Sequence, residues 1–365
     1  MAVVHDWGRK EPWGFGAGAA TDGTSPSGVM PGPTSSEPRV GSTGVRGELA
    51  TRTGARVAIL LATYNGARYL EQQLTSILMQ TYPEWEILAR DDGSCDDTVA
   101  ILESFAHRHP GRLRLVRDGA GHLGTRGNFA RLLEETDADY IAFCDQDDVW
   151  HPRRIELGLA RVRELEKARG RQSPILVFSD LTVVDEQLRV VAPSLWTYAR
   201  VTPSMARWKA LLTDNLVGGC TFLFNRALRD AAVPVPEEAF LHDSWVSLVA
   251  ALLGYVDALP VATVMYRQHT ANSVGARPNS LWHVARRLPR LWRRDAFVQH
   301  LARSQRQAEA IVQRYGSRLA PEVRAVLAGY ASLDSMGFLS RRIFLLRHRI
   351  FRQGWVRTVA FLARV

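Results

Sequence analysis

FCDQDDVW, residues 143–150, places three acidic side chains within four residues at the end of an apolar run. Carboxylates this close repel one another, so Asp145, Asp147 and Asp148 need a neutralising partner. The run before them, residues 139–145, is short and apolar and predicts a buried strand. Carboxylate oxygens at such a strand end suit a hard divalent cation, Mg²⁺ or Mn²⁺. For Asp148, a helix cap ahead of Pro152 is an equally good interpretation.

Strands and helices are predicted to alternate on the N-terminal side of this stretch and just beyond it. The predicted strands are 57–64, 85–92 and 112–118, and the predicted helices are 66–80, Asp96 or Asp97 to Pro110, 127–136 and Pro152 to about Arg169. This alternation predicts an α/β fold, a parallel sheet with helices on both faces. Residues Thr63–Asn65 and Asp91–Ser94 would then share one sheet edge with the acids, where open α/β sheets bind ligands.

The remaining segments have a different character. Residues 1–54 are rich in Gly, Ser, Pro and Thr and are predicted to be disordered. The later predicted elements are an extended segment at 174–186, a strand at 220–225, a helix at 242–254 and a strand at 261–269. The apolar run 245–256 is interpreted as a buried core helix, because it is too short to span a bilayer. From residue 281 the chain is predicted to be helical, and it is strongly basic.

Composition narrows the function classes. The 365 residues are 46% hydrophobic and 23% charged, with a formal net charge of +9, which predicts an anionic partner. The three cysteines are far apart, so neither a disulfide framework nor a zinc site is expected. This cysteine usage suits a protein of the reducing cytoplasm. We expect no nucleic-acid partner, because no zinc-finger or RRM pattern is visible. No secretory signal is apparent either.

The pattern T-Y-N, D-D-G-S and D-Q-D-D resembles the family 2 glycosyltransferases, which have a GT-A fold. Within that family, FCDQDDVW is similar to bacterial members assigned as rhamnosyltransferases. Three later segments agree: NLVGGCTFLFNR (215–226), HDSW (242–245) and YRQHTANSVG (266–275). The resemblance covers roughly residues 56–276. It implies a Rossmann-like, mostly parallel GT-A domain at 55–276, followed by a basic helical region at 277–365.

The resemblance also implies a role for individual residues. The implied nucleotide-binding residues are Thr63, Tyr64, Asn65, Asp91, Asp92, Asn128 and Asp145. The implied diphosphate-binding residues are Arg267 and His269, the implied metal ligands are Asp147 and His269, and the implied acceptor-binding residues are Gly218, Gly219, His242 and Trp245. Asp243 would be the general base that deprotonates the acceptor hydroxyl. Ser244 departs from the two aromatics that many relatives carry after this Asp.

Several of these residues have a structural alternative. Asp243 is also placed to cap the helix that follows it, and His269 alone would be an ordinary surface histidine. Gly218 and Gly219 would equally fit a tight turn. Trp150 and Trp245 could stack on a sugar, but such residues are more often part of a core. Asn128 lies in a glycine-broken loop that opens a helix, which could simply be a helix start.

The predicted activity is inverting, metal-dependent transfer of a sugar, plausibly rhamnose, from a dTDP- or UDP-sugar to a cell-surface glycan or lipid-linked acceptor. The alternatives are a metal-dependent phosphohydrolase and a non-catalytic nucleotide-binding protein at the membrane. Arginines alternate with apolar residues in 337–365, so amphipathic helices could hold the protein at the cytoplasmic face of the membrane. A helical subdomain packed on the core explains the same pattern.

Overall fold

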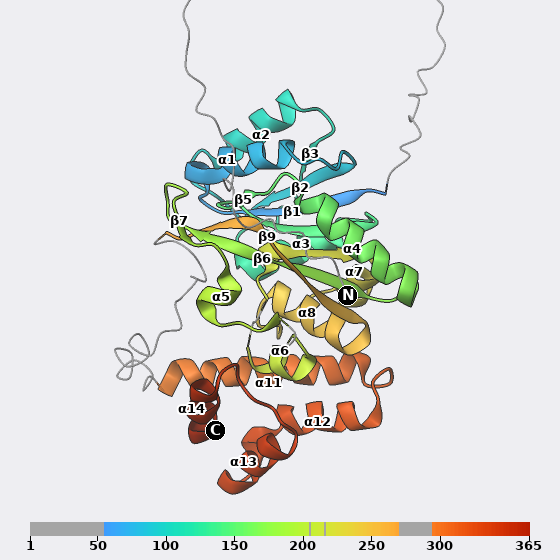
Figure 1. The fold of residues 1–365 in the computed structure, drawn as a ribbon, viewed down its shortest axis with the longest axis vertical. Helices are drawn as coiled ribbons and strands as arrows, with labels where there is room; N and C mark the ends of the chain where they lie inside the picture. Colours follow the sequence, from blue (N-terminus) through green and yellow to red (C-terminus); the bar gives the residue numbers. More distant parts are fainter. Residues whose placement is uncertain (1–54, 204–205, 215–216, 270–293) are drawn as a thin grey trace, which may run out of the picture. The chain divides into compact units, whose positions relative to one another are not determined.

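The computed structural model describes residues 55–203, 206–214, 217–269 and 294–365, all within one compact unit, Gly54–Val365 (Figure 1). The predicted disorder of residues 1–54 and the predicted boundary at 276/277 lie outside the described residues. In chain order the elements are β1 (Val57–Thr63), α1 (Ala67–Leu78), β2 (Trp85–Asp91), α2 (Thr98–Arg108), β3 (Leu113–Leu115), α3 (Gly124–Glu134), β4 (Tyr140–Asp145), β5 (Val149–Trp150), α4 (Arg154–Arg169), β6 (Ile175–Val184), β7 (Val190–Ala192), α5 (Leu195–Ala199), α6 (Trp208–Thr213), η2 (Gly219–Thr221), β8 (Phe222–Asn225), α7 (Arg226–Ala232), α8 (His242–Leu253), β9 (Tyr255–Arg267), α11 (Arg294–Tyr315), α12 (Pro321–Ala331), η3 (Leu333–Ser335), α13 (Phe338–Arg347) and α14 (Trp355–Arg364).

A single mixed sheet organises these elements. In the described part of the chain it has nine strands in the order β3-β2-β1-β4-β8-β6-β9-β5, with β7 paired to β6. Strands β3, β2, β1 and β4 are parallel, and β6 is parallel to β9. Strand β8 runs antiparallel to both β4 and β6, so it joins the two parallel groups. The predicted α/β fold with a mostly parallel sheet is confirmed.

Both faces of the sheet are covered by apolar side chains. In β1, Ala58 and Leu60 belong to one core cluster, whereas Val57, Ile59 and Leu61 belong to the other. Successive side chains of a strand point to opposite faces, so a strand buried on both sides reads as a continuous apolar run. Helices α3, α8 and α11 complete the first core, and α1, α2 and α4 complete the second.

Strand β9 corrects two predictions. The helix predicted at 242–254 ends at Leu253, and the strand predicted at 261–269 begins at Tyr255. Gly254 makes this turn possible, because a Cβ there would lie 1.9 Å from the carbonyl oxygen of Pro174. The backbone N–H of Tyr255 then donates to that same oxygen, which starts the pairing of β9 with β6. The run 245–256, predicted as one buried helix, is therefore helical as far as Leu253 and enters β9 at Tyr255.

Strand β5 is a short element that was not predicted, and it fixes the acidic segment. It pairs antiparallel with β9, Val149 opposite Met265 and Trp150 opposite Val264. Residues 145–148, called the acid loop below, therefore connect β4 to β5. Because β9 ends at Arg267, this pairing brings the acid loop beside the segment that follows β9.

The C-terminal helices share a core with the sheet domain. Phe297, Leu301 and Ile311 of α11 lie in the same apolar cluster as Trp245 and Leu248 of α8. Helix α11 packs against α6 and α12, at the end of the unit remote from α1 and α2 (Figure 1). No described helix has the length and apolarity needed to cross a membrane.

Candidate active site

The predicted strand ends meet at one edge of the sheet. The register pairs Thr63 with Asp91 and Ala62 with Asp145, so the ends of β1, β2 and β4 lie side by side. Thr63 Oγ1 donates to Asp91 Oδ1 over 2.9 Å. Parallel strands joined by helical crossovers place their carboxyl ends together, which explains why the convergence was predictable.

Gln146 ties the acid loop to the end of β1. Its side-chain oxygen accepts from the backbone N–H of Tyr64 over 2.9 Å, and its side-chain nitrogen donates to the Tyr64 carbonyl over 3.0 Å. A Cβ on Gly66 would lie 2.1 Å from the same side-chain oxygen, so only glycine permits this approach. Neither Gln146 nor Gly66 was predicted as a site residue.

Asp91 and Asp92 have different surroundings. Asp91 accepts from the N–H groups of Gly93 and Ser94, which makes a tight turn after β2. Asp92 is buried, and its two carboxylate oxygens accept from the N–H groups of Leu123 and Gly124 over 2.8 Å each. Asp92 therefore holds the start of α3, and the structure places it beneath the edge rather than on it.

Asn128 also lies behind the edge. It is buried, and its amide nitrogen donates to the carbonyls of Thr63 and Arg90. Asn128 is the fifth residue of α3, and it thus links this helix to the ends of β1 and β2. Because Asn128 is buried, a contact with the nucleotide at this edge would have to come from residues nearer the surface.

Tyr64 and Asn65 are the exposed members of the predicted nucleotide group. The ring of Tyr64 lies 4.8 Å from the ring of exposed His122, measured between centroids. Asn65 follows with a left-handed backbone, φ +47°, and its side-chain oxygen accepts from the N–H of Cys95. Two aromatic rings at this edge form a surface suited to stacking a base.

The acid loop lies beside the segment after β9, so the two implied metal ligands, Asp147 and His269, are close together. His269 Nε2 lies 2.8 Å from Asp147 Oδ2, although the two residues are 122 positions apart in sequence. Both side chains are mostly buried. Carboxylate and imidazole are both ordinary ligands of divalent metals.

Asp145 and Asp148 carry an electrostatic penalty. Burial and the charges of Asp147 and Asp243 raise the pKa of Asp145 to about 7. Burial and the charges of Asp147 and Asp145 raise the pKa of Asp148 well above its ordinary range. A cation near these carboxylates would stabilise their charged forms.

Asp148 is not the helix cap considered from the sequence. Helix α4 begins at Arg154 with Arg153 at the cap position, and no side chain caps it. Asp148 is fully buried, accepts from the N–H of Arg267 over 3.3 Å, and its Oδ2 has no hydrogen-bond partner among the described residues. Carboxylate oxygens of Asp145 and Asp148 and the Cys220 sulfur lie within 4.8 Å of one another, close enough for one ion.

Arg154 is a buried cation beneath the acids that the sequence did not reveal. Its guanidinium donates to the carbonyls of Phe143 and Phe222 and lies 4.1 Å from the Trp150 ring. Burial lowers the pKa of Arg154 to about 10, so it remains charged at neutral pH. It partly offsets the charge of Asp145, whose pKa it lowers.

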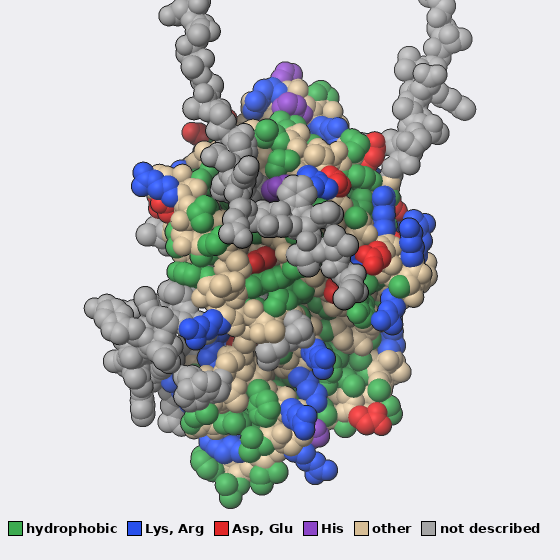
Figure 2. Space-filling view, viewed as in Figure 1, with side chains coloured by type: hydrophobic (Ala, Val, Ile, Leu, Met, Phe, Trp, Pro, Cys, Tyr) green, Lys and Arg blue, Asp and Glu red, His purple; other side chains and the backbone are tan. Residues whose placement is uncertain are grey.

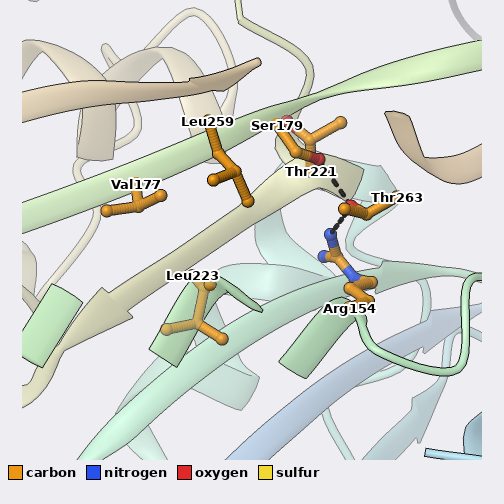
Figure 3. A pocket seen from close by; sticks show the side chains of 8 residues that line it. Arg154, Val177, Ser179, Thr221, Leu223, Leu259 and Thr263 are labelled. Atoms are coloured by element: carbon orange, nitrogen blue, oxygen red, sulfur yellow. Dashed lines mark hydrogen bonds between the residues drawn. The ribbon is translucent and has the colours of Figure 1, made fainter. Parts of the chain in front are cut away.

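A small polar cavity adjoins Arg154 (Figure 3). Arg154 Nη1 donates to Thr263 Oγ1, and that oxygen lies 2.6 Å from Ser179 Oγ. Leu223 and Leu259 close the other side, which leaves room for about one water. The cavity is too small for a sugar, so it belongs to the support of the site.

Arg267 lies where its predicted diphosphate contact is hard to make. Its side chain is buried, with Nε donating to the Asp147 carbonyl and Nη1 to the Glu186 carbonyl. Nη2 donates to the side chain of Gln72 over 2.7 Å. These bonds hold the acid loop in place, and a direct diphosphate contact would require Arg267 to exchange one of them.

Asp243 lies at the junction of α8 with the 219–221 turn. It is in the first turn of α8, whose cap residue is Leu241, so the structure does not support the capping alternative. Its Oδ2 accepts from the N–H of Gly219 over 3.2 Å. A Cβ on Gly219 would lie 2.9 Å from the Asp243 Cβ, so this glycine admits the carboxylate.

The residues predicted for acceptor binding differ in their exposure to solvent. His242 is buried, stacks on Phe129 at 3.9 Å, and burial lowers its pKa to about 4. Trp245 is fully buried and its indole N–H donates to the Ala232 carbonyl, so it is a core residue in this fold. Gly218 is exposed and lies next to Gly219.

Comparison with known proteins points to one family. The sequence model of glycosyl transferase family 2 matches residues 58–230. EpsE of Bacillus subtilis (strain 168), provisionally described as a glycosyltransferase, is 31% identical over 154 residues, 41% of this chain and 54% of EpsE. The dTDP-rhamnosyl transferase RfbG of Shigella flexneri is 28% identical over 222 residues, 59% of this chain and 74% of RfbG. The matched region thus spans about half of EpsE.

A solved structure agrees on the fold. The crystal structure of S. aureus TarS, residues 1–349, superposes with a TM-score of 0.51 at 17% identity. The superposition covers 80% of this chain and 73% of TarS 1–349. At this identity the likeness concerns the fold alone.

Proposed function

Because the chain belongs to glycosyltransferase family 2, we propose that it transfers a hexose from a nucleotide-diphosphate sugar to an acceptor hydroxyl with inversion. The observation that carries the proposal is the meeting of the Asp147–His269 pair with Asp145 and Asp243. Asp243 accepts from the N–H of Gly219, and the sulfur of the next residue, Cys220, lies within 4.8 Å of carboxylate oxygens of Asp145 and Asp148, so the candidate base lies near the acid loop. A donor seated on the acid loop would present its sugar toward Asp243.

The donor would lie along the ends of β1, β2 and β4. Tyr64, with His122 beside it, offers the base a stacking surface, and Asn65 lies at the same edge. Thr63, Asp91, Asp92 and Asn128 would act by holding these strand ends in place. Asp145 would meet the ribose or the sugar.

A divalent cation, Mg²⁺ or Mn²⁺, fits the acid loop. Asp147 and His269 would hold it, and Oδ2 of buried Asp148, which has no hydrogen-bond partner among the described residues, leaves a carboxylate oxygen of this loop open to a further partner. When bound, such a cation supplies positive charge for a leaving diphosphate. Arg267 would act by fixing the loop through the Asp147 carbonyl.

Asp243 would be the general base. Its carboxylate takes the proton of the acceptor hydroxyl while that oxygen attacks the anomeric carbon. The bond from the anomeric carbon to the diphosphate oxygen breaks on the opposite face, and its electron pair leaves with the diphosphate. Gly219 holds the base by donating its N–H to Oδ2. No enzyme nucleophile takes part, which is the requirement for inversion.

Rhamnose carried by dTDP is the proposed donor, and UDP-sugars are the alternative. Support comes from RfbG, the dTDP-rhamnosyl transferase that resembles this chain. The proposed acceptor is a growing cell-surface glycan or its lipid-linked precursor, reached from the cytoplasmic side of the membrane. TuaG of Bacillus subtilis (strain 168), provisionally described as a teichuronic acid biosynthesis glycosyltransferase, is 26% identical over 197 residues.

The first test is calorimetric binding of UDP, dTDP and GDP to the full chain, with and without Mn²⁺. Selective binding of one nucleotide that requires Mn²⁺ and is lost in Asp147→Ala would support the proposal. If folded protein bound none of the three, the site assignment would be overturned.

A second test separates the transferase from a non-catalytic nucleotide-binding protein. Asp243→Asn keeps the shape of the side chain and its position beside Gly219, but removes the base. We expect normal donor binding and transfer lowered by at least about 100-fold. Equal transfer by Asp243→Asn and wild type would exclude Asp243 as the base. Release of inorganic phosphate from a phosphomonoester without sugar transfer would favour a phosphohydrolase.

A further inference from the structure

Helix α13 presents an unusually exposed apolar face. Phe338, Leu339, Ile343 and Leu346 are 68%, 69%, 62% and 52% exposed. At the α-helical repeat these four residues fall within an arc of about 140°. On the neighbouring helix α14, Val359 is 58% exposed as well. Single exposed apolar residues are ordinary, but a contiguous face marks a surface that another body covers.

The helix that carries this face is firmly packed on its other side. Leu345 is fully buried in the main core cluster, and Phe344 packs so closely on Gly329 that a Cβ there would lie 2.5 Å from its ring. Arg342 donates to the Phe338 and Ala363 carbonyls, which ties α13 to α14. The exposed side chains are therefore held outward by a folded scaffold.

Strong positive charge surrounds the apolar face. Residues 337–365 contain seven arginines and no Asp or Glu. Within the described residues, Arg352 alone of the seven forms an ion pair, with Asp214. Arg347, Arg349, Arg357 and Arg364 are exposed. In Figure 2 the end of the unit that carries α13 shows apolar side chains bordered by Lys and Arg.

We propose that the α13 face, defined as Phe338, Leu339, Ile343 and Leu346, docks onto an anionic lipid bilayer. Apolar side chains would enter the boundary between headgroups and acyl chains, and the exposed arginines would contact lipid phosphates. A second copy of the chain is the less favoured occupant, because its own uncompensated arginines would face those of the first. The proposal goes beyond sugar transfer and does not rest on it.

The test is flotation of the full chain with lipid vesicles, either pure phosphatidylcholine or phosphatidylcholine mixed with phosphatidylglycerol. Wild type should float with the anionic vesicles alone. The double variant Leu339→Ser/Ile343→Ser should weaken binding by about tenfold or more. Val190→Ser/Val191→Ser is the matched control, because these exposed valines on β7 lie outside the α13 face, and its binding should match wild type.

The charge contribution has its own variant. Arg347→Gln/Arg357→Gln removes two exposed arginines and should weaken binding to anionic vesicles by about tenfold. All of these substitutions are at exposed positions, so thermal unfolding should stay close to wild type.

Three outcomes would overturn the proposal. The first is that folded wild type fails to float with anionic vesicles. The second is that Leu339→Ser/Ile343→Ser floats as well as the valine control. The third is a dimer in light scattering that Leu339→Ser/Ile343→Ser dissociates, without any lipid binding, which would assign the α13 face to a second copy.

Discussion

Gly219→Ala tests how the candidate base is positioned. A Cβ at residue 219 would lie 2.9 Å from Asp243 Cβ, 3.2 Å from Asp243 Oδ2 and 3.3 Å from His242 Nε2. Carbon atoms pack best at about 3.5 Å or more, so Asp243 must shift by about 0.6 Å (3.5 − 2.9). His242 cannot easily yield, because it is stacked on Phe129.

A shift of this size should lower turnover far more than donor binding. Misplacement of a catalytic group by about 1 Å can cost about 100-fold, so we expect kcat to fall by about 10- to 100-fold. The hydrogen bond from Gly219 N–H to Asp243, 3.2 Å long, should lengthen as well. Donor affinity should change by less than about threefold, since no hydrogen bond among the described residues joins the acid loop to residue 219.

Gly218→Ala is the matched control for this experiment. The backbone of Gly218, φ −74° and ψ 126°, suits any residue, and the nearest atom to a Cβ there is Cys220 Sγ at 3.8 Å. The measurements are kcat by product formation, donor Kd by calorimetry and Tm for both variants. Full activity in Gly219→Ala, or an equal loss in Gly218→Ala, would refute the argument. A large fall in Tm in Gly219→Ala with unchanged kcat would reduce the role of residue 219 to packing.

Three further predictions concern the charges of the site. Asp147→Asn and His269→Ala should each abolish the Mn²⁺-dependent part of donor binding in calorimetry, because they remove one member of the pair that would hold the cation. Arg154→Met should lower the free energy of unfolding by about 3 kcal/mol or more in urea titrations, since it leaves buried acids without their cation. Arg153→Ala, which removes a surface ion pair with Glu156, should leave the free energy of unfolding close to that of wild type. His242 has a folded pKa of about 4 against 6.5 when unfolded, so its contribution to stability is present above pH 6.5 and is lost as pH falls toward 4. Wild type should therefore lose about 2 kcal/mol more than His242→Asn between pH 6.5 and pH 5 in urea titrations, and parallel pH profiles would contradict this.

The fold was predictable where strands are buried on both faces. Residues 57–63 and 140–145 are apolar at nearly every position, and helices with clear periodicity separate such runs. Strand β9 was only half predicted, because its first residues read as the continuation of a helix. What ends that helix is the close approach of Gly254 to the Pro174 carbonyl, a tertiary contact that leaves no local pattern in the sequence. The strand predicted at 112–118 is shorter in the structure: β3 is Leu113–Leu115, and the backbone groups of Arg112 and Val116 make the last hydrogen bonds to β2.

The site was predictable to the extent that its residues lie at strand ends. Asp145 and Asp147 follow an apolar run, and the family resemblance supplied His269, which the structure pairs with Asp147. Arg154 could not be predicted, because a sequence does not distinguish a buried arginine from its neighbour Arg153, which pairs with Glu156 at the surface. For Trp245 the sequence offered both acceptor binding and a core position, and the structure places it in the core.

Two buried arginines lie next to the acid loop and partly neutralise its charge. Arg154 lies beneath the loop and Arg267 behind it, and both guanidinium groups also bond backbone carbonyls. These cations do not complete the compensation, because the pKa of Asp145 is still raised to about 7. A fold selected only for stability would replace such acids with neutral residues, since uncompensated buried charge is costly. The divalent cation proposed above would lie beside these acids and His269, and it would restore the charged form of Asp145.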